Sequence, residues 1–430
     1  IDLKDQMVFD TIMKGARTTA VFQLESAGMK ELILRLKPKN FDDIIALVAL
    51  YRPGPMQAGM VDTFVECKNG LRAVELLHPD LGDVLGGTYG VLVYQEQVMQ
   101  TAQTLAGFSL GGADMLRRAM GKKNIEEMEK QRSLFVDGCV NNGYDAQEAS
   151  GIFDSIEKFA GYGFNKSHSA AYALVSYQTA WLKTHYPEHF MSAVLTQDQS
   201  ELEKVVFYIN ECKNMEINVM PPDINTSAER FISMGKGQIS FSLTAIKGIG
   251  DKQVEKIITE REENGHYQDL SDFIVRTNAN KKTIESGIKS GLFDSFGETR
   301  ATMLASFEDL QEHSRRLKKR AAKKTEVTPQ LNMFGGIETN NQEVFVVRKE
   351  EMDVMSRLSG ERATLGMYVS GHPIHAYEKE IERVTTGKLR DLMELQVSSE
   401  EEKIVVKGEN KTKTKIRKKN KMVSVVGVIV

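Results

Sequence analysis

Four cationic side chains within one short segment could together bind an anion. Arg117, Arg118, Lys122 and Lys123 follow the pair Gly111-Gly112, which we expect to open a short helix. Residues four apart share a helix face, so Arg118 and Lys122 can approach one anion, with Arg117 about 100° around the axis. Glycines before the helix would leave backbone N–H groups free, and such groups favour phosphate. The solvated basic end of a surface helix explains the same residues equally simply.

A second polar segment, GYGFNKSHSAAY at residues 161–172, precedes a strongly helical stretch. Its two glycines allow a sharp bend, and we expect Ser167 or Ser169 to cap the following helix. Lys166 and His168 would then lie at the helix N-terminus, where anions are favoured. The alternative is that the polar residues of this segment only complete a tight turn.

The third segment, IKGIGDKQVEKI, has the pattern of a helix-hairpin-helix. We expect Gly248, Ile249 and Gly250 to form a hairpin between two helices, flanked by Lys247 and Lys252. Such a hairpin presents backbone N–H groups to a DNA phosphate and does not read bases. Binding would be independent of sequence and weakened by salt. A weaker second copy, TIESGIKSGLFDSFGETR, follows and supports a paired arrangement.

The elements that would position these segments are mainly α-helical. Apolar residues at helical spacing make residues 169–185 the clearest helix, with Pro187 close after its end. We predict four parts. They are a helical domain at 1–220, a tandem helix-hairpin-helix domain at 221–306 and a flexible or partly helical connector at 307–384. The fourth part, residues 385–430, is expected to be the truncated start of an OB-like β domain. Asp42 and Asp43 are expected at a helix start, where acids suit the dipole.

Composition excludes some classes of protein. A net charge of −3 over 430 residues argues against a uniformly basic surface, although local basic patches occur, including residues 315–324 and 411–421. No apolar run reaches the length of a membrane span. Cys67, Cys139 and Cys212 lack metal-ligand spacing and are expected to be reduced, partly buried thiols, as is typical of the cytoplasm. A start at Ile1 suggests a fragment.

Several long segments resemble one family in order along the chain. They are residues 19–38, 49–56, 88–123, 156–187, 242–257 and 362–374. The sequence is similar to the alpha subunits of bacterial DNA polymerase III, the C-family replicative polymerases, from the fingers region through the start of the OB region. The resemblance implies DNA-directed DNA polymerase activity for the full-length protein.

The resemblance assigns roles to the residues introduced above. It implies that Arg117 and Arg118 hold the triphosphate of the incoming dNTP, with Lys122 and Lys123 in support. Lys166 and His168 would contact the nucleotide or the template backbone. The planar fork of arginine suits phosphate oxygens. The resemblance also implies that Arg52, in the segment YRPGP, contacts DNA phosphate. The neighbouring prolines suggest a structural role instead.

Gln330, Leu331, Met333 and Phe334 lie in an otherwise polar stretch of the connector. Apolar residues in such a stretch are exposed at a cost unless a partner covers them. The stretch resembles a motif that binds the sliding clamp (the beta subunit), and its place after the hairpin domain is where this family carries that motif. Gln330 would bond at the pocket rim while the three apolar side chains fill a groove.

The catalytic centre of the resembled family is not recognisable here. Such a polymerase needs clustered carboxylates for two Mg²⁺ ions, and we find no segment like its catalytic aspartate motif. We therefore expect the full-length enzyme to use Mg²⁺ held elsewhere and this chain alone to be inactive. Further expected partners are primer-template DNA and other replisome subunits, with no membrane. A DNA- and clamp-binding adaptor without catalysis is the alternative, and a metalloenzyme lacks any ligand spacing. The basic segment 411–421 fits a loop that either contacts DNA or is merely solvated.

Overall fold

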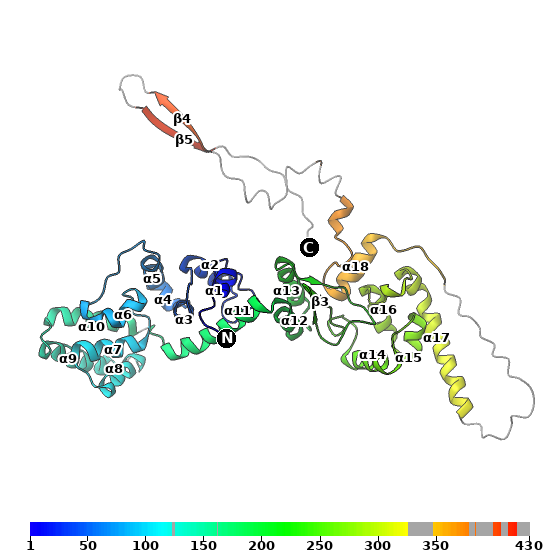
Figure 1. Ribbon diagram of the computed structural model, residues 1–430, viewed down its shortest axis with the longest axis horizontal. Coiled ribbons are helices and arrows are strands. Elements are labelled where there is room, and N and C mark those ends of the chain that lie inside the picture. Colours follow the sequence, from blue (N-terminus) through cyan, green and yellow to red (C-terminus); the bar gives the residue numbers. More distant parts are fainter. Residues whose placement is uncertain are drawn as a thin grey trace, which may run out of the picture. The chain divides into compact units, whose positions relative to one another are not determined.

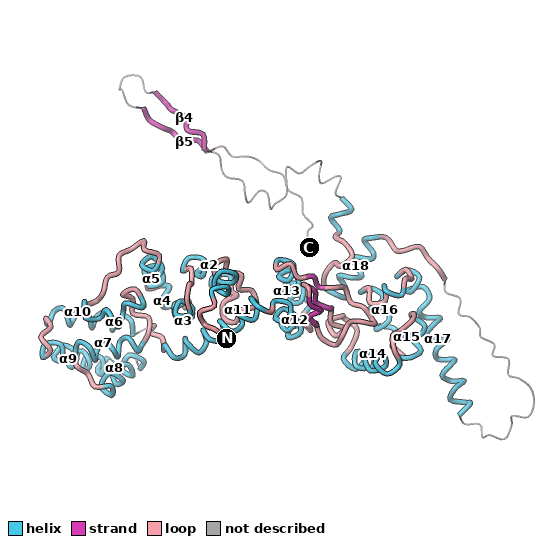
Figure 2. Tube along the Cα trace, in the orientation of Figure 1, coloured by secondary structure: helices cyan, strands magenta, loops and turns pink. Residues whose placement is uncertain are grey.

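The computed structural model describes residues 1–122, 125–160, 162–325, 347–377, 383, 399–405 and 412–418 (Figure 1). The chain divides into two compact units, residues 1–194 and 195–430, and each is described by itself. The described residues are mainly helical, with a small three-stranded sheet and one strand pair (Figure 2). The predicted mainly α fold is confirmed. The predicted domain limits stay a prediction.

The first unit is built from helices around two hydrophobic cores. One core joins the helices at the start of the unit with α11, and the other lies among α6 to α10. The helices are α1 (Gln6–Val8), the π-helical η1 (Phe9–Met13), α2 (Ala27–Leu36), α3 (Phe41–Leu50), α4 (Pro53–Gln57), α5 (Met60–Lys68), η2 (Pro79–Leu81), α6 (Gly82–Leu85), η3 (Gly86–Thr88), α7 (Gln95–Ala106), α8 (Leu110–Lys122), α9 (Ile125–Asn141), α10 (Ala146–Ala160), α11 (Lys166–His185) and α12 (Pro187–Gln197), the last of which crosses the unit limit.

Helix α11 confirms the predicted helix, and several of the apolar residues that indicated it lie on its exposed side. Leu174, Val175 and Leu182 are exposed, whereas Tyr177 and Lys183 are buried. The Lys183 ammonium is accommodated because it donates to two backbone carbonyls, those of Arg17 and Thr19, each at 2.9 Å. Small residues between them let α11 pack closely on α3. The apolar period therefore identifies the helix, but it does not identify the side that is buried.

Asp42 and Asp43 lie in the first turn of α3, as predicted. Asp43 is buried, and its carboxylate accepts from the Lys68 ammonium at 2.8 Å and the Lys39 N–H at 2.7 Å. It is therefore committed to the fold.

The second unit carries two hairpins, each followed by a helix, beside a small sheet. In this sheet β3 lies between β1, which is parallel to it, and β2, which is antiparallel. Its elements are α13 (Leu202–Asn214), β1 (Asn218–Val219), β2 (Ile232–Gly235), β3 (Gln238–Ser240), α14 (Asp251–Asn264), α15 (Leu270–Thr277), α16 (Lys281–Ser290), η4 (Asp294–Phe296), α17 (Arg300–Thr325), α18 (Val354–Leu365), η5 (Pro373–Tyr377), β4 (Ser399–Val405) and β5 (Thr412–Lys418). Helix α17 thus continues past residue 306, the predicted start of the connector, and includes the basic run 315–324.

Strands β4 and β5 form an antiparallel pair near the end of the chain. This pair agrees with the β character predicted from residue 385, but residues 412–418 were predicted as part of a loop and instead form β5. Lysine and threonine alternate there, and Thr412 and Lys418 pair with Val405 and Ser399 of the partner strand. Alternation of period two favours a strand even without an apolar face. An OB-like completion falls on residues outside the described ones.

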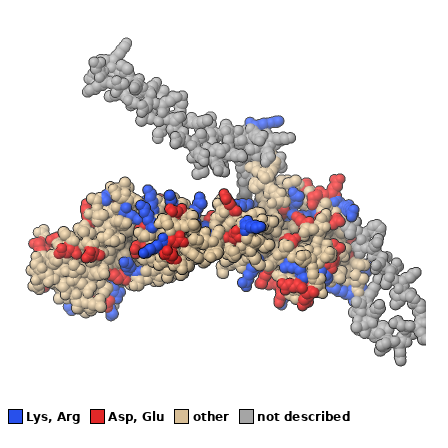
Figure 3. Space-filling model, in the orientation of Figure 1, with Lys and Arg blue, Asp and Glu red and all other residues tan. Residues whose placement is uncertain are grey.

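The surface and the thiols agree with the composition. In the face shown in Figure 3, cationic and acidic side chains are interspersed over the described surface. The three cysteines form no disulfide and are buried, more fully than predicted, and burial raises the pKa of the Cys139 thiol to about 11. None of the described helices is both long and apolar enough to cross a membrane.

Candidate nucleotide and DNA interface

The arginines of α8 share one carboxylate. Arg117 donates to one oxygen of Asp114 at 2.7 Å and Arg118 donates to the other, also at 2.7 Å. The side chain of Arg117 is 33% exposed and that of Arg118 is 68% exposed, so an anion in solvent can reach both. The bond from Arg117 is the main reason that the pKa of Asp114 lies below its ordinary value. Two positive charges with one negative charge leave the pair net positive.

The start of α8 differs from the prediction. Gly111 and Gly112 lie inside the first turn, and the Ser109 hydroxyl accepts the N–H of Gly112 at 3.1 Å. This N–H is therefore capped within the chain and is not free for phosphate, because serine is a favourable N-cap residue. Lys122 is the last residue of α8, and its side chain, like Lys123, lies outside the described part.

The start of α11 is capped by a residue that the sequence did not single out for this role. The Asn165 side chain accepts the N–H of His168 at 2.8 Å, so neither Ser167 nor Ser169 is the cap. Ser169 is buried and donates to the carbonyl of Ile45 at 2.6 Å, which ties α11 to α3. The serines fit the cap by residue preference, but both lie inside the helix, whereas Asn165 has the extended backbone of the residue just before it.

Glu96 and Tyr94 hold the α11 start against α7. The Glu96 carboxylate accepts from the Asn165 amide at 2.8 Å and from the Lys166 N–H at 2.9 Å. Tyr94 is buried and pairs with Phe164 in an isolated parallel bridge. Both residues therefore pack and form hydrogen bonds within the fold.

Arg52 is mostly committed to the fold. Its guanidinium donates to the carbonyls of Ala49 and Tyr162, at 2.9 and 3.0 Å, and lies 4.0 Å from the centre of the Phe164 ring. Burial lowers its pKa. These contacts favour the structural interpretation. Stacking on an aromatic ring contributes about 0.5–2 kcal/mol in such settings.

Lys166 and His168 are exposed beside this cluster. The Lys166 ammonium lies 5.4 Å from the centre of the Tyr94 ring, and the His168 ring lies 4.5 Å from that of Tyr172. Their side chains therefore point away from the core at a helix N-terminus. Among the described residues, no hydrogen bond or ion pair links Lys166 or His168 with the α8 arginines.

The first hairpin is open to solvent at its tip. Gly248 adopts a left-handed φ of 103°, and a Cβ there would lie 2.2 Å from the Ser286 hydroxyl, so only glycine fits. Gly250 is the N-cap of α14, and no side chain of the described residues caps this helix. Lys247 and Lys252 are exposed, while Ile249 is buried.

Only one of the two helices predicted around this hairpin forms. Helix α14 follows it, but residues 241–247 make turns. The reason is local: the Ser242 hydroxyl accepts the Ala245 N–H at 3.3 Å and donates to the Glu229 carbonyl at 2.6 Å. Serine bonding to nearby backbone competes with helix formation.

The residues that resemble a clamp-binding motif, Gln330, Leu331, Met333 and Phe334, lie outside the described residues. Sequence reasoning missed Asp114 as the partner of the α8 arginines, although its spacing of three and four residues was visible. Among the described residues, no three His, Cys, Asp or Glu side chains gather as metal ligands would.

Comparisons with known proteins agree with these local structures. A family model of the finger domain of the bacterial DNA polymerase III alpha subunit matches residues 1–143. A helix-hairpin-helix motif matches residues 216–303, which include both hairpins.

Curated relatives extend the match along the chain. The DNA polymerase III subunit alpha of Vibrio cholerae serotype O1 is 50% identical over 404 residues, covering 91% of this chain and 34% of that protein. That of Escherichia coli K12 is 49% identical over 407 residues, with the same coverage, and that of Campylobacter jejuni is 45% identical over 409 residues, covering 93% and 33%. The chain thus spans about a third of the length of these relatives. The chain therefore carries the finger domain of the bacterial DNA polymerase III alpha subunit and a helix-hairpin-helix motif, and 91% of it is similar to such subunits.

Proposed function

We propose that this chain supplies the nucleotide- and DNA-holding parts of a replicative DNA polymerase, in which Arg117 and Arg118 bind the triphosphate of the incoming dNTP. The observation that carries the proposal is the shared carboxylate of Asp114, which leaves two exposed guanidinium groups with a net positive charge. Asp114 also fixes the two side chains side by side. An incoming triphosphate could then replace or join this carboxylate at the same forks.

The reaction would be template-directed nucleotidyl transfer. Positive groups stabilise the charge that develops on the transferring and leaving phosphates, and this is the role of the α8 arginines, supported by Lys122 and Lys123. Lys166 and His168, exposed at the start of α11, would contact the nucleotide or template. Mg²⁺ would be held by carboxylates in the remainder of the full-length protein, where it polarises the phosphate oxygens.

DNA would be held by the exposed first hairpin, through Lys247, Lys252 and the backbone around Gly248, Ile249 and Gly250. Arg52 would act mainly by positioning the α11 start. The proposed tether to the sliding clamp, through Gln330, Leu331, Met333 and Phe334, rests on the resemblance of these residues to a clamp-binding motif. Other replisome subunits are further proposed partners.

The test is primer extension by the full-length polymerase carrying paired substitutions. Arg117→Ala with Arg118→Ala should lower kcat by about 100-fold, because one lost charge-stabilising donor costs this much in comparable sites. Arg316→Ala is the matched control, since Arg316 is also exposed and also pairs with an acid four residues earlier, Glu312. The present chain alone should extend no primer.

The alternative function is a DNA- and clamp-binding adaptor without a nucleotide site. It predicts that the α8 substitutions and Arg316→Ala have equal, small effects on extension by the full-length protein. That equality would overturn the proposed nucleotide role of α8 while leaving DNA binding by the hairpin intact.

A further inference from the structure

The two hairpins of the second unit carry opposite charge. The first is flanked by the exposed cations Lys247 and Lys252. The second, at residues 291–299, contains no Lys or Arg and has two acids, Asp294 and Glu298, whose side chains are 50% and 43% exposed. DNA phosphate is attracted to the first set of charges and repelled by the second.

The helix start after the second hairpin is already occupied by a carboxylate. Glu351 accepts from the N–H of Arg300 at 3.1 Å and from that of Ala301 at 3.3 Å. These two N–H groups open α17 and would be the ones to meet a phosphate. Burial raises the pKa of Glu351, but the backbone N–H bonds outweigh this and hold the pKa below its ordinary value. The carboxylate thus acts as a resident anion.

Neighbouring contacts fasten this carboxylate in place. The hydroxyls of Thr299 and Thr302 donate to the Lys349 carbonyl, at 2.9 and 3.1 Å, and the Lys349 N–H donates to the Thr302 hydroxyl at 2.9 Å. Three hydrogen bonds to Lys349 therefore join the stretch around residues 349–351 to the start of α17. At α14, the corresponding helix start has no such side-chain cap.

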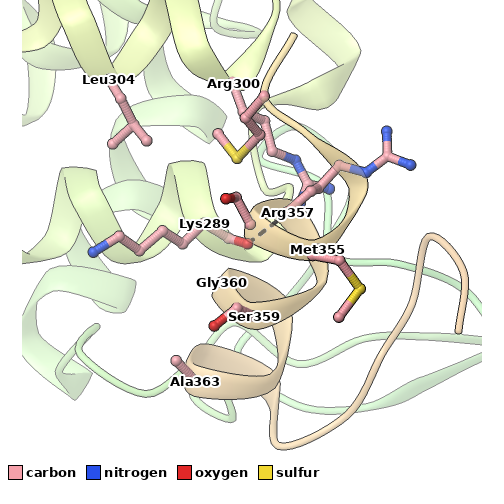
Figure 4. A pocket seen from close by; sticks show the side chains of 10 residues that line it. Lys289, Arg300, Leu304, Met355, Arg357, Ser359, Gly360 and Ala363 are labelled. Carbon is pink, nitrogen blue, oxygen red and sulfur yellow. Dashed lines mark hydrogen bonds between the residues drawn. The ribbon is translucent and has the colours of Figure 1, made fainter. Parts of the chain in front are cut away.

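Arg300, at the start of α17, is turned inward, whereas two other cations beside the second hairpin, Lys289 and Arg348, are exposed. Arg300 is nearly buried and donates to Asp294 at 2.6 Å, to Glu361 at 3.0 Å and to the Lys289 carbonyl at 3.3 Å. Figure 4 shows this bond to Lys289 beside a pocket of about 660 Å³ between α16, α17 and α18. A Cβ at Gly291 would lie 2.3 Å from the Arg300 guanidinium, so the hairpin is built around this inward cation.

We propose that, of the two hairpins in this unit, only the first contacts duplex DNA, and that the second holds residues 349–351 at the start of α17. The proposal rests on the proposed DNA-binding function and adds which of two similar hairpins performs it. The partner is the sugar-phosphate backbone of one DNA strand. The helix start after the second hairpin is already occupied by Glu351, and the arginine at that start, Arg300, is turned inward.

The experiment measures binding of the intact chain to a fluorescent 20-bp duplex by anisotropy over a salt series. Lys247→Glu with Lys252→Glu should weaken binding at least tenfold at about 100 mM salt. These substitutions should also flatten the slope of log K against log salt by up to about 1.8, since each phosphate contact contributes about 0.9. Glu298→Lys, on the exposed second hairpin, should change affinity less than twofold and leave the slope unchanged.

The other outcomes distinguish a failure of this inference from a failure of the proposed DNA-binding function. If Glu298→Lys tightens binding and steepens the slope by about 0.9, the second hairpin touches DNA and the inference fails, while the proposed DNA binding stands. If the unmodified chain shows no salt-dependent binding, the proposed DNA-binding function fails and this inference with it. Glu298→Gln and circular dichroism of each variant control for charge placement and folding.

Discussion

The arginines of α8 and Arg300 of α17 show two opposite ways of pairing arginine with acid. On α8, two arginines share one carboxylate at the surface, and a net positive charge faces solvent. At the start of α17, one arginine lies between two carboxylates, with its own side chain 6% exposed and that of Glu361 fully buried. The ratio of cations to acids and the burial differ, although the residue types are the same.

This difference separates binding from support. Exposed ion pairs contribute little to folding, about 0–1 kcal/mol, so the α8 arginines can exchange their partner at small cost. A buried charge that loses its partner costs about 3–5 kcal/mol, so Arg300 is held in place. An arginine next to a glycine-containing turn is therefore no guide to phosphate binding until the acids around it are counted.

The largest expected effect comes from Arg300→Met, which leaves Glu361 buried without its cation. We expect the second unit to lose about 3–5 kcal/mol of opening free energy. Amide hydrogen exchange in α16 to α18 measures this change, and α3 and α11 of the first unit serve as an internal reference. Arg118→Met is the matched control and should change protection in α8 by less than about 0.5 kcal/mol. Equal losses of protection in the two variants would show that the buried and the exposed arginine pairs do not differ in their contribution to stability.

An intermediate effect is expected at acid pH from Glu361. Burial raises its pKa, but the N–H groups of Ser370 and Val369 and the charge of Arg300 outweigh this, so its pKa lies below the ordinary 4.5. A depressed pKa gives stability that is present above pH 4.5 and is lost as the pH falls through the folded-state value.

Protection of α17 and α18 should therefore decline below pH 4.5 in the unmodified chain. It should decline less steeply in Glu361→Gln, whose amide oxygen still accepts a hydrogen bond but does not titrate. Parallel declines in the two proteins would show that other carboxylates dominate the acid response.

The smallest effect on folding should come from Asp114→Asn. Both arginines remain exposed, so we expect less than about 0.5 kcal/mol of change in α8 protection. The net positive charge of the pair rises, so inorganic triphosphate should bind a few fold more tightly at low salt, as judged by calorimetry. Weaker binding would mean that Asp114 is needed to orient the arginines more than to hold their charge.

Much of the fold was readable from local sequence. Helix α11, the acids at the start of α3, the hairpin glycines and the buried thiols follow from periodicity and residue preference acting over a few neighbours. The wrong predictions have equally local causes: Ser109 caps α8, Asn165 caps α11, and Ser242 holds a turn where a helix was predicted.

The remaining features depend on residues far apart in the chain. Glu351 reaches the start of α17 from about fifty residues away, and Glu361 meets Arg300 across a similar separation. No spacing rule within a helix or hairpin predicts such a contact. The sequence therefore indicated two similar hairpins, and only the tertiary structure distinguished them.

Because its cysteines are buried, the folded chain should react poorly with thiol reagents. Cys67, Cys139 and Cys212 are all buried, and at neutral pH the raised pKa of Cys139 leaves almost none of it as the reactive thiolate. A maleimide dye should consequently not label the natural thiols of the folded chain. Met115→Cys, at an exposed position of α8, would then offer a single labelling position where fluorescence could follow the approach of a nucleotide, without removing a native cysteine or either arginine.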